Sequence, residues 1–171
     1  MPEPQIIRWG IIATGGIAKA FGKDVSVDPA TRNVKDIRHE LVAAASSSSK
    51  SRAESFLREC GAPEHATAYS SYSELAQDPR VDVIYIATPH SHHYQNAMMC
   101  LEAGKNVLCE KAFTVNAKQA RALAAKAKEK NLLLMEGMWT RYFPLSIYVR
   151  ELVTSGRLGP VERVLAKHSL P

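Results

Sequence analysis

The segment ATPHSHHY at 87–94 places three imidazoles directly after an apolar run. His90, His92 and His93 could supply metal ligands to a hydrolase, because imidazole is a common zinc ligand. Neighbouring residues at the start of a helix point about 100° apart, however, and no Asp, Glu or Cys follows at ligand spacing. The pattern therefore disfavours a metallohydrolase, and we expect no metal among the site residues.

A glycine-rich turn follows the first apolar run, in GIIATGGIA at 10–18. Backbone N–H groups in such a turn can meet a pyrophosphate because no Cβ stands in the way. The pattern is AxGxxA, with Ala13 in place of the first glycine of the usual dinucleotide fingerprint. The residues expected at the pyrophosphate are Thr14, Gly15, Gly16 and Ile17. Taken alone, the pattern also fits a strand-to-helix turn that binds nothing.

The second long apolar run ends in AAASSSSKSR, without the Asp or Glu that binds the ribose 2′-OH of NAD. Hydroxyl and cationic side chains stand there instead, and they suit the 2′-phosphate of NADP. The residues expected at this phosphate are Ser47, Ser48, Lys50 and Arg52. The alternative is a solvated loop in which Ser49 or Ser51 caps the next helix, a role compatible with phosphate contact.

Apolar runs of strand length recur along the chain with helical patterns between them. The expected strands cover 6–13, 39–45, 66–69, 81–87, 106–110 and 132–136, and the expected helices 16–26, 50–60, 73–78, 91–104 and 116–130. The runs are continuous rather than alternating, which is typical of parallel strands covered on both faces. Gly61 and Gly104 suit helix C-caps, and Ser71 with Glu74 suits a capping box. We expect an α/β, Rossmann-type, doubly wound sheet that binds ligands at the carboxyl ends of its strands.

Composition limits the class of protein. The 171 residues include 46% hydrophobic residues and three cysteines, with a formal net charge of +5. Three irregularly spaced cysteines fit neither a disulfide framework nor a zinc knuckle. The apolar runs are shorter than the ~18 residues that span a bilayer, and the basic residues are spread along helices rather than gathered with aromatics. We expect a soluble, cytoplasmic protein that binds neither membrane nor nucleic acid.

Five blocks in order carry a resemblance to a known family: WGIIATGGIA, ATPHSHHY, MMCLEAGKNVLCEKAF, MEGMWTRYFP and SGRLGPVERV. They resemble the Gfo/Idh/MocA oxidoreductases along nearly the whole chain. Within that family, EKAFTVNAKQA and EGMWTRYFP are most similar to NADP-dependent D-xylose dehydrogenases and dimeric dihydrodiol dehydrogenases. The resemblance implies an NADP-dependent enzyme that transfers hydride between the cofactor and a CH–OH group of an aldose or a trans-dihydrodiol.

The resemblance also implies roles for individual residues. Lys111 would be the catalytic lysine beside the nicotinamide, able to take the proton of the reacting hydroxyl, although Ala112 stands where most relatives have proline. His93 would be a second catalytic residue facing the cleft, and Glu110 would orient the lysine or accept from the nicotinamide ribose. Around the cofactor the resemblance adds Thr88, Pro89 and His90, and at the substrate Trp139, Arg141 and Tyr142. The last three also fit a packed aromatic cluster between domains.

The resemblance divides the chain in two. Residues 1–143 would be the NADP-binding Rossmann domain, and 144–171 a linker helix with the first strand of a second α/β domain. In relatives that domain closes the active site and pairs subunits into homo-oligomers. We therefore expect a piece of a longer gene product or a truncated chain with little activity alone. The alternative function is an inactive NADP(H)-binding remnant or a regulatory protein.

Overall fold

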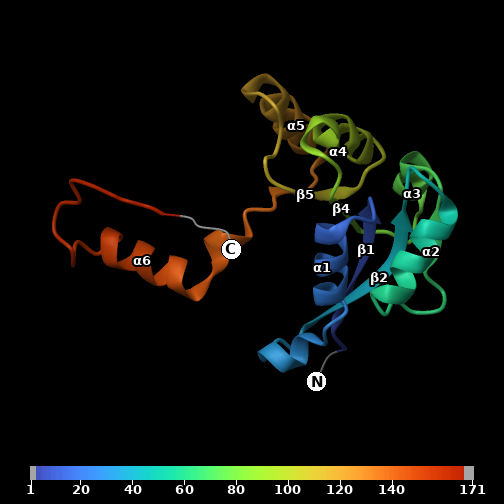
Figure 1. The fold of residues 1–171 in the computed structure, drawn as a ribbon, viewed down its shortest axis with the longest axis horizontal. Coiled ribbons are helices and arrows are strands. Elements are labelled where there is room, and N and C mark those ends of the chain that lie inside the picture. Colours follow the sequence, from blue (N-terminus) through green and yellow to red (C-terminus); the bar gives the residue numbers. More distant parts are fainter. Residues whose placement is uncertain (1–2, 168–171) are drawn as a thin grey trace. The chain divides into compact units, whose positions relative to one another are not determined.

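The computed structural model describes residues 3–167, which form two compact units divided between Gly137 and Met138. The first unit is an open sheet of six parallel strands with helices on both faces (Figure 1). Its strands are β1 (Gln5–Ile12), β2 (Ile37–Ala45), β3 (Thr67–Tyr69), β4 (Val83–Ile86), β5 (Asn106–Cys109) and β6 (Leu134–Glu136). Its helices are α1 (Gly16–Val25), α2 (Lys50–Glu59), α3 (Tyr72–Gln77), α4 (His93–Glu102) and α5 (Ala117–Lys130), with the 3-10 turns η1 (Pro29–Arg32) and η2 (His90–His92). The predicted doubly wound α/β fold is confirmed.

Strand β1 lies at the centre of the sheet, in the order β3-β2-β1-β4-β5-β6. Its neighbours β2 and β4 both run parallel to it, so the carboxyl ends of all three strands lie at one edge. Ile12 at the end of β1 stands opposite Ala45 and Ile86 in the register. The chain order reverses between β1 and β4, which marks the crevice where ligands of such sheets bind.

The two faces of the sheet carry separate hydrophobic clusters. Ile12 packs in the cluster with α3, α4 and α5, whereas Ile11 packs in the cluster with α1 and α2. Successive strand residues point to opposite faces, and both faces are covered here. This two-sided burial explains why the apolar runs in the sequence are continuous rather than alternating.

The helix ends follow most of the predicted signals. Gly61 and Gly104 adopt left-handed φ angles of 69° and 79° after α2 and α4, and the Ser49 side chain caps α2 by accepting from Arg52 N at 3.3 Å. The predicted capping box at α3 is wrong, because the hydroxyl of Ser71 contacts Ser73 Oγ at 2.7 Å and makes no cap bond. A nearby hydroxyl has replaced the backbone as its partner.

The second unit contains the 3-10 turn η3 (Trp139–Tyr142) and helix α6 (Pro144–Thr154), near the predicted linker helix. None of its described residues is buried. The first strand of a second domain, which the resemblance implied within 144–171, is absent over the described residues 144–167, and residues 168–171 lie outside the described part of the chain. A strand needs a neighbouring strand for its backbone hydrogen bonds, and the described residues of this unit contain none.

A buried carboxylate ties β3 to the segment between α3 and β4. Asp78 is 4% exposed, and it accepts hydrogen bonds from the hydroxyl of Tyr69 at 3.0 Å and from Arg80 Nη2 at 2.7 Å. Burial alone would raise the pKa of this carboxyl, but the bonds from Arg80 and Tyr69 lower the pKa below its ordinary value. Lys105 Nζ donates to the backbone carbonyl of Asp78 at 2.7 Å, which joins the α4–β5 connection to the same point.

Replacement of this carboxylate should destabilise the fold in a pH-dependent way. We expect Asp78→Asn to lower the free energy of unfolding at pH 7 by about 2 kcal/mol, the range for a lost charged hydrogen bond. Because the pKa is lowered on folding, this stabilisation is present above about pH 4 and is lost as pH falls through the folded-state pKa. Urea unfolding at pH 7 and pH 3 measures both values. Exposed Glu54→Gln is the control, and an equal deficit at both pH values would contradict the prediction.

Candidate functional site

The glycine turn opens the site at the carboxyl end of β1. Helix α1 begins at Gly16, and its N-cap Gly15 provides no side chain for the free N–H groups of the first turn. A Cβ built on either glycine would meet no protein atom within 4 Å. Packing therefore does not require glycine here, whereas close approach of a phosphate to the helix start does. Thr14 and Ile17 flank this turn, as expected.

Ala13 has the backbone conformation that the first glycine of the fingerprint normally supplies. Its φ is 77°, in the left-handed region that L-residues rarely adopt. Its N–H still donates to the carbonyl of Ala45 at 3.0 Å, so the turn stays attached to β2. Alanine at this position is therefore compatible with a left-handed turn that remains bonded to β2.

The serine loop and the start of α2 form the second part of the site. Ser47 and Ser48 are exposed, and so are Lys50 and Arg52 in the first turn of α2. That turn contains no acidic residue, although the positive end of a helix dipole favours anions and disfavours cations. Two cations at a helix start are consistent with an anionic ligand. Sequence reasoning missed Tyr72, whose hydroxyl donates to Ser47 Oγ at 3.3 Å.

A hollow of about 180 Å³ joins the two parts of the nucleotide site. It brings together Thr14 from the glycine turn and Arg52 from α2, both expected to contact the cofactor. Its other lining residues are Lys19, Ser55, Phe56 and Glu59. The ammonium of Lys19 pairs with the carboxylate of Glu59, so α1 and α2 are joined across this hollow.

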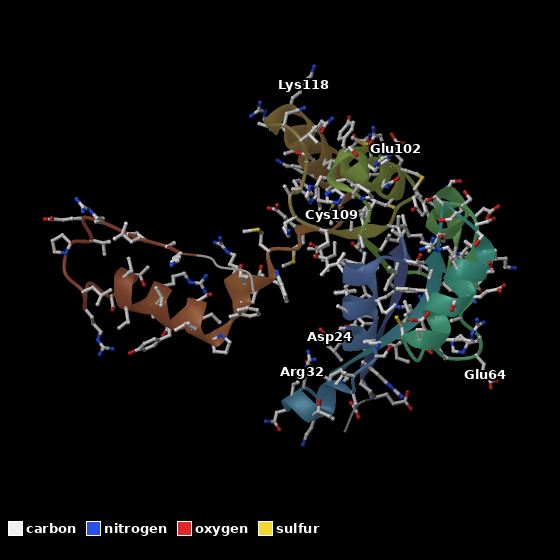
Figure 2. All side chains as sticks on the ribbon, viewed as in Figure 1. Asp24, Arg32, Glu64, Glu102, Cys109 and Lys118 are labelled. Atoms are coloured by element: carbon white, nitrogen blue, oxygen red, sulfur yellow. The ribbon has the colours of Figure 1, made fainter. Side chains whose placement is uncertain are left out.

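Lys111 lies on an exposed loop directly after β5, whose last residue, Cys109, is labelled in Figure 2. The Lys111–Ala112 peptide is cis. Hydrogen bonds hold the backbone on both sides of the lysine: Glu110 N donates to the carbonyl of Ile86 at 3.0 Å, and Phe113 N donates to the side-chain Oε1 of Glu136 at 3.0 Å. The backbone position of Lys111 is therefore fixed, while its side chain is free to reach a ligand.

His93 lies beneath this edge and does not face an open cleft, so the expected orientation of its ring is wrong, while its catalytic role stays a prediction. Its exposed fraction is 0%, and its Nδ1 and Nε2 lie 2.8 and 2.9 Å from the carbonyl oxygens of Ala112 and Thr88. The imidazole thus bridges the segment after Lys111 and the end of β4. Thr88 is itself buried, and its hydroxyl accepts from Asn96 Nδ2 at 3.2 Å.

The other histidines and Pro89 lie at the surface beside this bridge. His90 and Pro89 are exposed, and the ring of His90 meets that of His93 edge-on at 5.5 Å. His92 is also exposed, with its Nδ1 3.0 Å from Ser91 Oγ. Within residues 3–167, no group of three or more His, Cys, Asp and Glu side chains is placed to hold a metal ion.

A hydrogen bond between Tyr85 and Glu110 was not predicted. The hydroxyl of Tyr85 donates to Glu110 Oε1 at 2.8 Å. Tyr85 is 1% exposed, and burial raises the pKa of its phenol, with a further contribution from Glu110. The signal in the sequence was a polar group within the apolar run VDVIYIA, because a buried hydroxyl requires a partner.

The substrate residues predicted from the resemblance lie in the second unit. Trp139, Arg141 and Tyr142 form the turn η3 and are exposed, and the rings of Trp139 and Phe143 meet edge-on at 5.7 Å. Their place beside a substrate stays a prediction.

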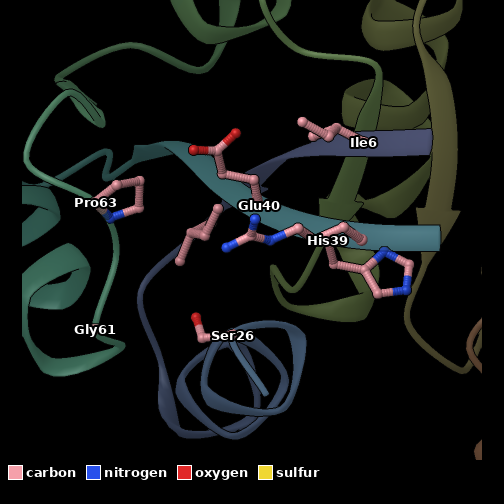
Figure 3. A pocket seen from close by; sticks show the side chains of 8 residues that line it. Ile6, Ser26, His39, Glu40, Gly61 and Pro63 are labelled. Atoms are coloured by element: carbon pink, nitrogen blue, oxygen red, sulfur yellow. The ribbon is translucent and has the colours of Figure 1, made fainter. Parts of the chain in front are cut away.

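A separate hollow of about 290 Å³ lies along the amino-terminal half of β2 (Figure 3). Arg38, Glu40 and Ser26 contribute polar groups to its wall, and Ile6 and Pro63 contribute apolar ones. It contains none of the residues predicted for the nucleotide site. Glu40 already pairs with His65 Nε2 at 3.1 Å.

A parallel sheet with a glycine turn after its first strand and cations after its second defines a dinucleotide-binding Rossmann domain. Residues 7–138 match the family model described as an oxidoreductase family with an NAD-binding Rossmann fold. The chain therefore belongs to the Gfo/Idh/MocA oxidoreductases. No helix among the described residues is long and apolar enough to cross a membrane.

Two relatives show where the similarity is strongest. The D-xylose 1-dehydrogenase (NADP(+)) of Hypocrea jecorina is 59% identical over 168 residues, which are 98% of this chain and 43% of that protein. The trans-1,2-dihydrobenzene-1,2-diol dehydrogenase of Mus musculus is 42% identical over 90% of this chain and 43% of its own length. The chain thus spans less than half the length of these relatives.

Solved structures agree on the fold. An NAD binding oxidoreductase from Klebsiella pneumoniae superimposes with a TM-score of 0.79 at 30% identity, over 90% of this chain and 40% of that one. KijD10, a 3-ketoreductase from Actinomadura kijaniata crystallised with NADP, gives a TM-score of 0.76 at 29% identity, over 91% of this chain and 46% of that one.

The left-handed angle at Ala13 predicts an unusual response to glycine. We expect Ala13→Gly to raise the free energy of unfolding by up to about 1 kcal/mol, because relief of the left-handed strain exceeds the cost of the extra conformational entropy that glycine gives the unfolded chain. The control is Ala20→Gly on the exposed surface of α1, which should lower that free energy by about 1 kcal/mol. Urea denaturation compares the two variants, and destabilisation by both would show that residue 13 is unstrained.

Proposed function

We propose that the protein is an NADP-dependent oxidoreductase that transfers hydride between NADP(H) and a CH–OH group of an aldose, with D-xylose as the first candidate. The observation that carries the proposal is the position of Lys111, exposed directly after β5 at the sheet edge where the glycine turn also lies. The 59% identity to a D-xylose 1-dehydrogenase supports this choice of substrate.

NADP fits the residues at the nucleotide edge. The open space at Gly15 and Gly16 leaves room for a pyrophosphate at the start of α1. Lys50 and Arg52 supply positive charge for a 2′-phosphate, and β2 ends without the carboxylate that would repel it. The NADP in the name of the xylose dehydrogenase and in the KijD10 crystals supports the same cofactor.

The chemistry assigned to this chain is the transfer of a proton. The nicotinamide ring of bound NADP supplies the acceptor for the hydride that leaves the substrate carbon. As the C–H bond breaks, Nζ of Lys111 accepts the hydroxyl proton and the C=O bond forms. The backbone bonds of Glu110 and Phe113 hold the lysine at this point, and His93 bridges the next segment to the end of β4.

A trans-dihydrodiol is the second candidate substrate, favoured by the 42% identity to the mouse dihydrodiol dehydrogenase. In either case we place Trp139, Arg141 and Tyr142 at the substrate, where aromatic faces and a guanidinium can bind a polyhydroxylated ring.

We also propose that the protein is a cytoplasmic homo-oligomer. Cys60, Cys100 and Cys109 are all free and buried, as expected in a reducing compartment.

The proposed preference for NADP depends on Lys50 and Arg52, so their removal should weaken NADPH binding selectively. We expect Lys50→Ala with Arg52→Ala to weaken NADPH binding at least ~10-fold, the effect of a lost charged hydrogen bond, and NADH binding much less. Tryptophan fluorescence titration with both nucleotides measures this difference. Lys118→Ala with Arg121→Ala on α5 removes the same charge elsewhere and should leave both affinities unchanged. Equal losses for NADPH and NADH in the α2 variant would contradict the assignment.

The role of Lys111 predicts loss of catalysis without loss of binding. We expect Lys111→Met to reduce kcat for NADP reduction about 10²- to 10⁴-fold, as for removal of a general base, with NADPH affinity largely retained. The assay uses the full-length gene product, with D-xylose and a trans-dihydrodiol as alternative substrates. Lys118→Met is the matched control. A Lys111 variant with an unchanged rate would remove this residue from the mechanism.

A further inference from the structure

The Tyr85–Glu110 hydrogen bond lies where the proposed cofactor and the catalytic lysine would meet. Glu110 is the residue before Lys111, directly after β5, and Tyr85 belongs to the neighbouring strand β4. The donor is almost fully buried, at 1% exposure, so this bond is shielded from competition with water. A shielded hydrogen bond to a carboxylate holds that carboxylate in one orientation.

The direction of the Tyr85 hydroxyl is set from the opposite side by α1. The ring of Phe21 stacks on that of Tyr85 with centroids 3.9 Å apart and planes at 23°. Trp9 packs edge-on against Phe21 at 5.3 Å. Phe21 belongs to α1, the helix that begins at the glycine turn. The packing of Phe21 on Tyr85 therefore connects α1 to the carboxylate of Glu110.

The carboxylate of Glu110 is confined on its other side as well. Gly137, directly after β6, has no side chain there, and a Cβ at that position would lie 3.1 Å from Glu110 Oε1. Oε1 is therefore enclosed between β4 and the end of β6. Among residues 3–167, no protein donor makes a hydrogen bond to Oε2. One carboxylate oxygen is thus fixed and the other is available to a ligand.

Lys111 is not the partner of that second oxygen. Among the described residues, the ion pairs of the molecule include none between Lys111 and Glu110. An available carboxylate oxygen beside a dinucleotide crevice is an acceptor for hydroxyl donors. The hydroxyls that a bound dinucleotide brings to the ends of the strands are those of its ribose.

We propose that Tyr85 is a positioning residue that acts through Glu110, holding the second carboxylate oxygen to accept a hydrogen bond from a ribose hydroxyl of bound NADP(H). This inference rests on the proposed function, since it requires the dinucleotide. The resemblance already implied a ribose contact for Glu110, and the new element is the support of that carboxylate by Tyr85.

The test is Tyr85→Phe, which removes the hydroxyl and keeps the ring stacked on Phe21. We expect the dissociation constant of NADPH to rise about tenfold, the effect of a hydrogen bond to a charged group, with kcat at saturating NADP within about threefold. Tyr69→Phe is the matched control, because it removes another hydrogen bond from a tyrosine to a carboxylate, 3.0 Å long, at Asp78. It should lower the Tm and leave NADPH binding unchanged.

A double-mutant cycle separates positioning from general destabilisation. Glu110→Gln should weaken NADPH binding at least as much as Tyr85→Phe, and the double variant no more than Glu110→Gln alone. Additive losses, unchanged binding in either single variant, or a fall in kcat with unchanged NADPH affinity would overturn the inference. Failure of the unaltered protein to bind NADPH would instead overturn the proposed function, and the inference with it.

Discussion

Parallel pairing of β1 with β2 and with β4 is the constraint on which the first unit depends. Because all three strands run in one direction, their carboxyl ends bring the glycine turn, the serine loop and the end of β4 to one edge. Both faces of the sheet are covered by helices, so this edge is where polar groups can serve a ligand. The position of the candidate site is therefore determined by the common direction of the strands, and the side chains determine what it can bind.

Electrostatics at this edge runs against what stability alone would favour. Lys50 and Arg52 stand in the first turn of α2, where the helix dipole is positive and acidic residues are stabilising. By contrast, the Asp78 network pairs a buried carboxylate with Arg80 and Tyr69, as stability requires. Charge is thus unfavourable for the helix at the start of α2 and well paired at Asp78, a contrast that agrees with the proposed role of Lys50 and Arg52 in cofactor binding.

The sequence was sufficient for the strands and helices of the first unit, because burial on both faces makes most of its strands continuous apolar runs. It could not give the direction of a side chain. The resemblance placed His93 in the motif, but only the path of α4 shows that its ring is enclosed between two carbonyl oxygens. The Tyr85–Glu110 bond joins residues 25 positions apart on neighbouring strands, and no local pattern encodes such a pair. The strand that the resemblance implied near the end of the chain is absent over 161–167, because a strand forms only where a neighbouring strand can take its backbone hydrogen bonds.

The left-handed angle at Ala13 has a consequence for how such domains diverge. The turn requires a torsion angle at this position, and the residue type matters through the energy that it costs to hold that angle. Once neighbouring strands hold the turn, drift from glycine to alanine can pass through populations without altering the phosphate-facing backbone. Distantly related domains can therefore lose the glycine motif from their sequences while the backbone N–H groups of the turn keep their direction.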